Sequence, residues 1–128
     1  MQTKNEYDSP VARITKDENG IFVFKLKNTS TAFDLEEARN QKRYLAVESG
    51  GKPYKTIIDT TGSLALPNDE ACEYYLTENN FENVISLVVN SLPMQLLLGQ
   101  LVKRHEVPNI KIFKKAKDAY DWILIQEF

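Results

Sequence analysis

Two short runs of apolar residues near the start of the chain have the spacing of a β-hairpin. Residues 11–16 and 21–27 are rich in β-branched and aromatic side chains, and the four residues between them end in Asn19-Gly20. Asn-Gly is the strongest short signal for a tight turn between two paired strands. The pattern therefore predicts that the two segments pair as antiparallel strands.

The rest of the chain alternates between helical and strand-like patterns. The helix predicted for residues 35–49 has clear ends, because Asp34 is followed by Glu37 three residues later and the pattern stops at Gly50-Gly51. Residues 84–89 (VISLVV) are apolar throughout, which is typical of a central parallel strand covered on both faces. The other predicted elements are strands at residues 56–59 and 109–114 and helices at residues 67–79, 92–106 and 116–126.

The predicted order of elements is ββαβαβαβα. One hairpin followed by three strand-to-helix units predicts an α/β single domain, in which helices pack on a mixed, mostly parallel sheet that is antiparallel at its N-terminal hairpin. Residues 1–10 show no such pattern and are expected to be a loose N-terminal segment. The domain would then span residues 11–128.

Composition excludes several classes of function. The net charge is −2 and charged residues of both signs are interspersed, so we expect no nucleic-acid partner. The chain starts without the apolar stretch of a signal peptide, and no segment approaches about 18 consecutive apolar residues, so we expect a cytoplasmic protein without a membrane span. Cys72 and His105 are the single cysteine and the single histidine. We therefore predict no metal, no cofactor and no catalytic set built on histidine.

The best-placed acidic residue is Asp59, at the carboxyl end of a predicted buried strand, where open α/β sheets bind their ligands. Residues 59–64 (DTTGSL) come close to the DKTG[TS]L pattern of haloacid-dehalogenase-type phosphotransferases but lack its lysine. The later strands also end without the acidic pair that would hold Mg²⁺. A small phosphotransfer or hydrolytic enzyme using Asp59 is therefore the alternative, not the preferred interpretation.

This loop has three other interpretations. A receiver domain would need an acidic pair beside Asp59, but Asp17 and Glu18 lie at the hairpin tip, at the opposite edge of the sheet. A phosphate-binding loop would need more than one glycine or a GK[ST] sequence. The simplest interpretation is that Asp59, Thr60 and Thr61 satisfy the backbone at the strand end and that Asn68 or Asp69 caps the next helix.

The element order and this loop resemble the SpoIIAA-like, or STAS (sulphate transporter and anti-sigma factor antagonist), domains. The closing NIKIFKKAKDAYDWI is similar to the ending of small single-domain STAS/SEC14-like proteins of the Bacteroidetes type. In regulatory members of the family, a strand and loop lead to Asp-Ser-Ser-Gly at a helix start, and a partner kinase phosphorylates the first serine. A gap-free alignment places Pro67-Asn68-Asp69-Glu70 there, so none of the four residues agrees.

The resemblance implies a non-enzymatic regulatory or binding module without the usual phosphoserine, because Asn68 has no hydroxyl. Its expected contact, with a protein partner or a small anionic ligand, is the loop and helix start at residues 59–69. Within this segment Thr60, Thr61 and Ser63 are candidate phosphate acceptors, Gly62 matches the family glycine, and Asp69 could imitate a phosphorylated state. Lipid or metabolite binding, as in the SEC14 branch, is a weaker alternative, because the chain lacks the additional helices that enclose such a cavity.

The helix predicted for residues 92–106 is apolar over more than one stripe. Leu92, Met94 and Leu96 extend its apolar surface beyond the face that a single sheet can cover. A helix of this kind is either deeply buried or pairs with another surface. We therefore predict partial burial together with a protein contact, for example in a homodimer.

Overall fold

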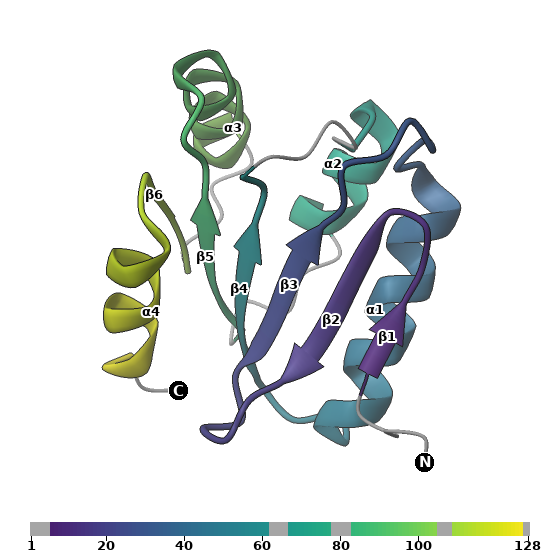
Figure 1. The fold of residues 1–128 in the computed structure, drawn as a ribbon, viewed down its shortest axis with the longest axis vertical. Helices are drawn as coiled ribbons and strands as arrows, with labels where there is room; N and C mark the ends of the chain where they lie inside the picture. Colours follow the sequence, from purple (N-terminus) through teal and green to yellow (C-terminus); the bar gives the residue numbers. More distant parts are fainter. Residues whose placement is uncertain (1–5, 62–66, 78–82, 105–108, 127–128) are drawn as a thin grey trace.

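The computed structural model describes residues 6–61, 67–77, 83–104 and 109–126. It contains one six-stranded sheet in the order β1-β2-β3-β4-β5-β6, in which β1 to β3 are antiparallel and β3 to β6 are parallel (Figure 1). The predicted α/β fold with a mixed sheet is thereby confirmed. The strands are β1 (Glu6–Asp8), β2 (Ala12–Lys16), β3 (Phe22–Leu26), β4 (Lys55–Asp59), β5 (Val84–Val88) and β6 (Ile110–Phe113), and the helices are α1 (Leu35–Ser49), α2 (Asp69–Thr77), α3 (Leu92–Arg104) and α4 (Ala116–Leu124).

The first strand corrects the expectation of a loose segment over residues 1–10. Glu6–Asp8 pair with β2 at the edge of the sheet, although this three-residue strand has no apolar pattern that would reveal it. Side-chain hydrogen bonds hold this strand on α1. The hydroxyls of Tyr7 and Ser9 donate to Oε2 of Glu37, at 3.0 Å and 2.8 Å. The Tyr7 ring also packs on Tyr44, with ring centroids 5.6 Å apart. These contacts are distant in sequence, so no local signal predicts them.

The hairpin between β2 and β3 forms as predicted. Gly20 has a φ of 77°, and Oδ1 of Asp17 accepts hydrogen bonds from the backbone N–H groups of Asn19 and Ile21. Oδ2 of Asp17 accepts a further bond from the Tyr120 hydroxyl at 2.6 Å. Because β3 runs parallel to β4, this tip lies at the opposite edge of the sheet from Asp59, which agrees with the exclusion of a receiver domain.

Helix α1 has the predicted ends. Oδ1 of Asp34 accepts a hydrogen bond from the Glu37 backbone N–H at 3.0 Å, and Gly50 closes the helix in the left-handed conformation. The Glu37 carboxylate is directed to the core side, where Oε2 also accepts from Gln41 at 2.7 Å. Gln41 is fully buried, and its Oε1 accepts from the Tyr75 hydroxyl of α2. A polar chain therefore connects β1, α1 and α2.

Helices cover both faces of the sheet. In β4, Ile57 packs with Ala119 and Ile123 of α4, whereas Ile58 packs with the cluster that contains residues of α1 and α2. Successive residues of a strand point to opposite faces, so α4 lies on one face and α1 and α2 lie on the other. Among the described helices, none combines the length and apolarity that a membrane span would need.

Two buried hydroxyls in the central strands have no hydrogen-bond partner among the described residues, Oγ of Ser86 and Oγ1 of Thr56. Burying an unpaired hydroxyl costs about 1–3 kcal/mol. We therefore expect Ser86→Ala to raise the free energy of unfolding by about 1 kcal/mol in denaturant titrations, and Thr56→Val to act in the same direction. The exposed Ser30, changed to Ala, is the control and should leave stability unchanged. Destabilisation by both core variants would show that these hydroxyls are paired in solution.

Candidate functional site

The polar side chains at the end of β4 and in the turn after it are hydrogen-bonded to one another and to nearby backbone. Oδ1 of Asp59 accepts from the Thr61 backbone N–H at 2.9 Å and from the Thr61 hydroxyl at 2.6 Å. The Thr60 hydroxyl donates to the Val88 carbonyl at 2.8 Å, which ties the end of β4 to the end of β5. This is the arrangement that the simplest interpretation of the loop predicts. It holds Asp59 in a turn at the carboxyl edge of the sheet.

The start of α2 is capped by Asn68. Its Oδ1 accepts from the Ala71 backbone N–H at 2.9 Å, and its own N–H donates to the Phe33 carbonyl at 3.0 Å. Asp69 follows as the first helical residue and is exposed, with Glu70 beside it in the same acidic turn. The structure thus uses Asn68 as the cap. Gly62 and Ser63, the other two candidates in this segment, lie outside the described residues.

Helix α3 presents apolar side chains to solvent. It lies beyond the carboxyl end of β5, and Nε2 of Gln95 donates to the Val89 carbonyl at 2.6 Å (Figure 1). Leu92 is 63% exposed and Leu96 is 61% exposed. Because residues four apart lie on the same face of a helix, these two leucines form one apolar surface. The side chain of Met94, the third predicted interface residue, lies outside the described part of the structure.

The exposed face of α3 continues with polar and charged side chains toward the end of the helix. Gln100 and Lys103 follow Leu92 and Leu96 at helical spacing, and both are exposed. Arg104 adds a second exposed cation in the last turn. We call Leu92, Leu96, Gln100 and Lys103 the α3 stripe. It combines two large apolar side chains with a basic end.

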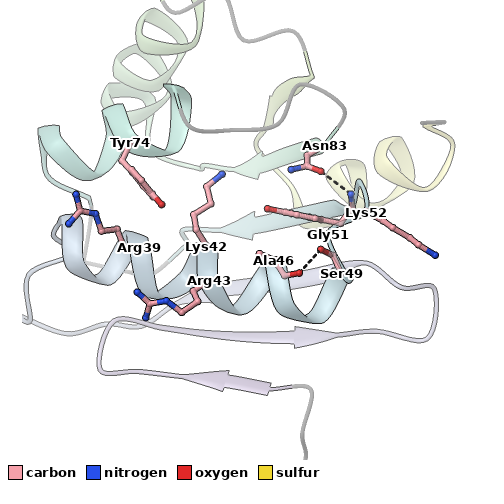
Figure 2. A pocket seen from close by; sticks show the side chains of 10 residues that line it. Arg39, Lys42, Arg43, Ala46, Ser49, Gly51, Lys52, Tyr74 and Asn83 are labelled. Atoms are coloured by element: carbon pink, nitrogen blue, oxygen red, sulfur yellow. Dashed lines mark hydrogen bonds between the residues drawn. The ribbon is translucent and has the colours of Figure 1, made fainter.

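A second feature is a groove between α1 and α2, which the sequence analysis did not predict. Its volume is about 490 Å³, and Lys42 and Tyr74 point into the space between the two helices (Figure 2). Arg39 and Arg43 line the α1 side, and Lys52 lines the end beyond α1. The remaining lining residues are Ala46, Ser49, Gly51, Tyr54 and Asn83. We call this the basic groove.

The floor of the basic groove lies at the amino ends of β4 and β5. Asn83 is buried, and its Oδ1 accepts from the Tyr54 backbone N–H at 3.0 Å, which fixes the amide orientation (Figure 2). Burial, and to a smaller extent the nearby Tyr74, raises the pKa of Tyr54 to about 12. Tyr54 therefore remains a neutral hydrogen-bond donor at physiological pH.

A sequence signal for the basic groove does exist. Arg39, Lys42 and Arg43 stand at i, i+3 and i+4 of a correctly predicted helix, a spacing that places three cations on one face. The opposite wall and the floor come from Tyr74 and Asn83, which are distant in sequence. From the sequence alone, where the packing of α2 beside α1 is not known, the three cations would be interpreted as an ordinary solvent-exposed helix face.

No protein-family model matches the sequence, and the comparison with curated proteins finds no match. A comparison with solved structures finds a crystal structure of an uncharacterized protein of the DUF3478 family, with a SpoIIAA-like fold, from Shewanella loihica PV-4. The likeness has a TM-score of 0.60 at 17% sequence identity and covers 96% of this chain and 98% of that chain. The resemblance stated from the sequence is thereby confirmed for the fold: this chain has a SpoIIAA-like fold over nearly its whole length.

Proposed function

We propose that the chain is a non-enzymatic binding module of the STAS type that binds a protein partner through the α3 stripe. The observation that carries the proposal is the exposure of Leu92 and Leu96 together, one turn apart. A contiguous exposed apolar surface often marks a site of protein interaction. The basic end at Lys103 favours a partner surface in which acidic side chains flank an apolar anchor.

The proposed binding role does not use Asp59 as a catalytic group. One carboxylate oxygen, Oδ1, accepts two hydrogen bonds from Thr61, and these bonds fix the carboxylate within its own turn. Within the described ranges, no three His, Cys, Asp or Glu side chains group in a way that could hold a metal ion. A phosphotransfer enzyme at this position would need such a group to neutralise the transferred phosphoryl.

The other proposals for residues 59–69 receive less support. An anionic ligand would meet the carboxylates of Asp59, Asp69 and Glu70, which repel it. The hydroxyls of Thr60 and Thr61 donate to the Val88 carbonyl and to Asp59, so phosphate on either would cost these bonds. The basic groove is lined by four cations, which do not suit the acyl chain of a lipid.

The proposal is tested with the double variant Leu92→Glu/Leu96→Glu. Proteins captured from the source cells by the wild-type chain and by the variants are quantified. The candidate partner is then purified, and its affinity for each chain is measured by titration. We expect a partner whose affinity for the double variant falls roughly a hundredfold or more, because two apolar anchors are lost and acidic side chains are opposed. Val47→Glu is the matched control, since Val47 is 70% exposed on α1. It should leave the affinity unchanged, and Asp69→Lys shows whether residues 59–69 also contribute.

Three outcomes would overturn the proposal. Binding that is equally sensitive to Val47→Glu would place the contact elsewhere. If light scattering shows that the wild type is a homodimer and the double variant a monomer, the α3 stripe would be assigned to contact with a second copy of the chain. Mg²⁺-dependent turnover of a generic phosphate ester that Asp59→Asn abolishes would make the chain an enzyme.

A further inference from the structure

We propose that the basic groove is a second binding site, separate from the α3 stripe, and that its ligand is a small molecule bearing a phosphate or another multivalent oxyanion. The groove lies at the amino ends of β4 and β5, whereas α3 follows the carboxyl end of β5. Its volume, about 490 Å³, is within the range of small-molecule sites. The α3 stripe, for which we propose a protein partner, is therefore a separate surface.

Positive charge is concentrated along the basic groove. Arg39, Lys42, Arg43 and Lys52 line the groove, and no acidic side chain is among its described lining residues. The chain as a whole carries a net charge of −2, so this local excess runs against the average. Cations often stabilise the last turn of a helix through its dipole, but the last turn of α1 contains no basic residue. The dipole of α1 therefore does not explain Arg39, Lys42 and Arg43.

The hydrogen-bonding character of the walls is the second argument. Oδ1 of Asn83 is occupied by the Tyr54 N–H, and the amide nitrogen is turned away from that bond (Figure 2). The hydroxyl of Tyr74 on the opposite wall can donate a hydrogen bond. Guanidinium and ammonium groups are donors without acceptor capacity. The groove thus offers mainly donors, which match the several acceptor oxygens of a phosphate.

Partial order of the cationic side chains is the third argument. Nη1 of Arg43 donates to Oδ1 of Asn40 at 3.1 Å, and Nζ of Lys42 lies 5.1 Å from the centroid of the Tyr75 ring. The first contact holds Arg43 along α1, and the second directs Lys42 toward α2, before any ligand arrives. A ligand then pays less side-chain entropy than it would on four unrestrained surface lysines.

Titration with inorganic pyrophosphate at constant ionic strength tests the proposal. Calorimetry should show saturable binding, and amide NMR shifts should concentrate at Ala46, Gly51, Lys52 and Asn83. The double variant Arg39→Gln/Lys52→Gln should bind roughly tenfold more weakly or worse, because each charge-assisted hydrogen bond is lost from an exposed side chain. Both side chains are exposed, so the variant is expected to fold.

Lys114→Gln/Lys115→Gln provides the matched control, because it removes two exposed cations from the segment between β6 and α4 and changes the net charge equally. It should leave pyrophosphate affinity unchanged. Equal weakening by both double variants, or shifts that never saturate, would reduce the effect to overall charge and overturn the proposal. Binding to phosphatidylserine vesicles that depends on Arg39 and Lys52, without pyrophosphate binding, would overturn it in favour of a membrane surface.

Discussion

Gln41→Leu is expected to lower the free energy of unfolding by about 2–3 kcal/mol, although it replaces a buried side chain with an apolar one of similar size. Gln41 is fully buried, donates to Glu37 at 2.7 Å and accepts from the Tyr75 hydroxyl. Leucine leaves the Tyr75 hydroxyl without its partner in a mostly apolar environment. Glu37 still accepts from Tyr7 and Ser9, so the stranded hydroxyl is the main cost. Urea titration of the purified variant measures the change.

The control for this prediction is Tyr75→Phe. Combined with Gln41→Leu it removes both partners, and replacing both groups of a buried hydrogen bond is far less costly than removing one. The double variant should therefore be more stable than the sum of the two single changes predicts, by about 1 kcal/mol or more. Additive effects would show that Gln41 and Tyr75 are not coupled in solution.

The fold could be predicted because its signals are local. Asp34 and Gly50 mark the ends of α1 within a few residues of the helix they terminate, and Gly20 marks the hairpin in the same way. The parallel arrangement of β3 to β6 follows from the alternation of strands and helices, since a crossover helix returns the chain to the same edge. Three kinds of information, caps, turns and alternation, were sufficient for the architecture.

The features that could not be predicted depend on contacts between distant residues. β1 pairs through only three residues, and its anchor is Glu37, about thirty positions later. The basic groove likewise joins cations of α1 to Tyr74 and Asn83, and nothing in the local pattern places these residues together. Within the predicted segment 59–69, Asp59 was a candidate for ligand binding or chemistry only because of its position at the carboxyl end of a buried strand. The structure shows that its nearest donors belong to its own turn.

Stability should remain nearly constant between about pH 8 and about pH 10 and then fall steeply toward about pH 12. The pKa values of Tyr7, Tyr44 and Tyr54 are raised to about 12, with burial as the largest cause in each case. The unfolded chain releases these protons near pH 10, its ordinary tyrosine value. Because the folded pKa lies above the unfolded one, the stabilisation is complete below about pH 10 and is lost as pH rises through the folded pKa.

Of these three tyrosines, Tyr54 is the most buried, so it should contribute most to the loss of stability. One pKa unit corresponds to about 1.4 kcal/mol. Tyr54 should account for roughly 2–3 kcal/mol by about pH 12, whereas solvent screening reduces the shares of Tyr7 and Tyr44. Denaturant midpoints measured from about pH 8 to about pH 12, with tyrosinate absorbance recorded in parallel, give the slope. Tyr54→Phe removes one titrating group, so its slope should be shallower by up to about 1.4 kcal/mol per pH unit, even if the variant is less stable at neutral pH. An unchanged slope would mean that Tyr54 ionises in the folded protein near its ordinary pKa, and that the floor of the basic groove is open to water.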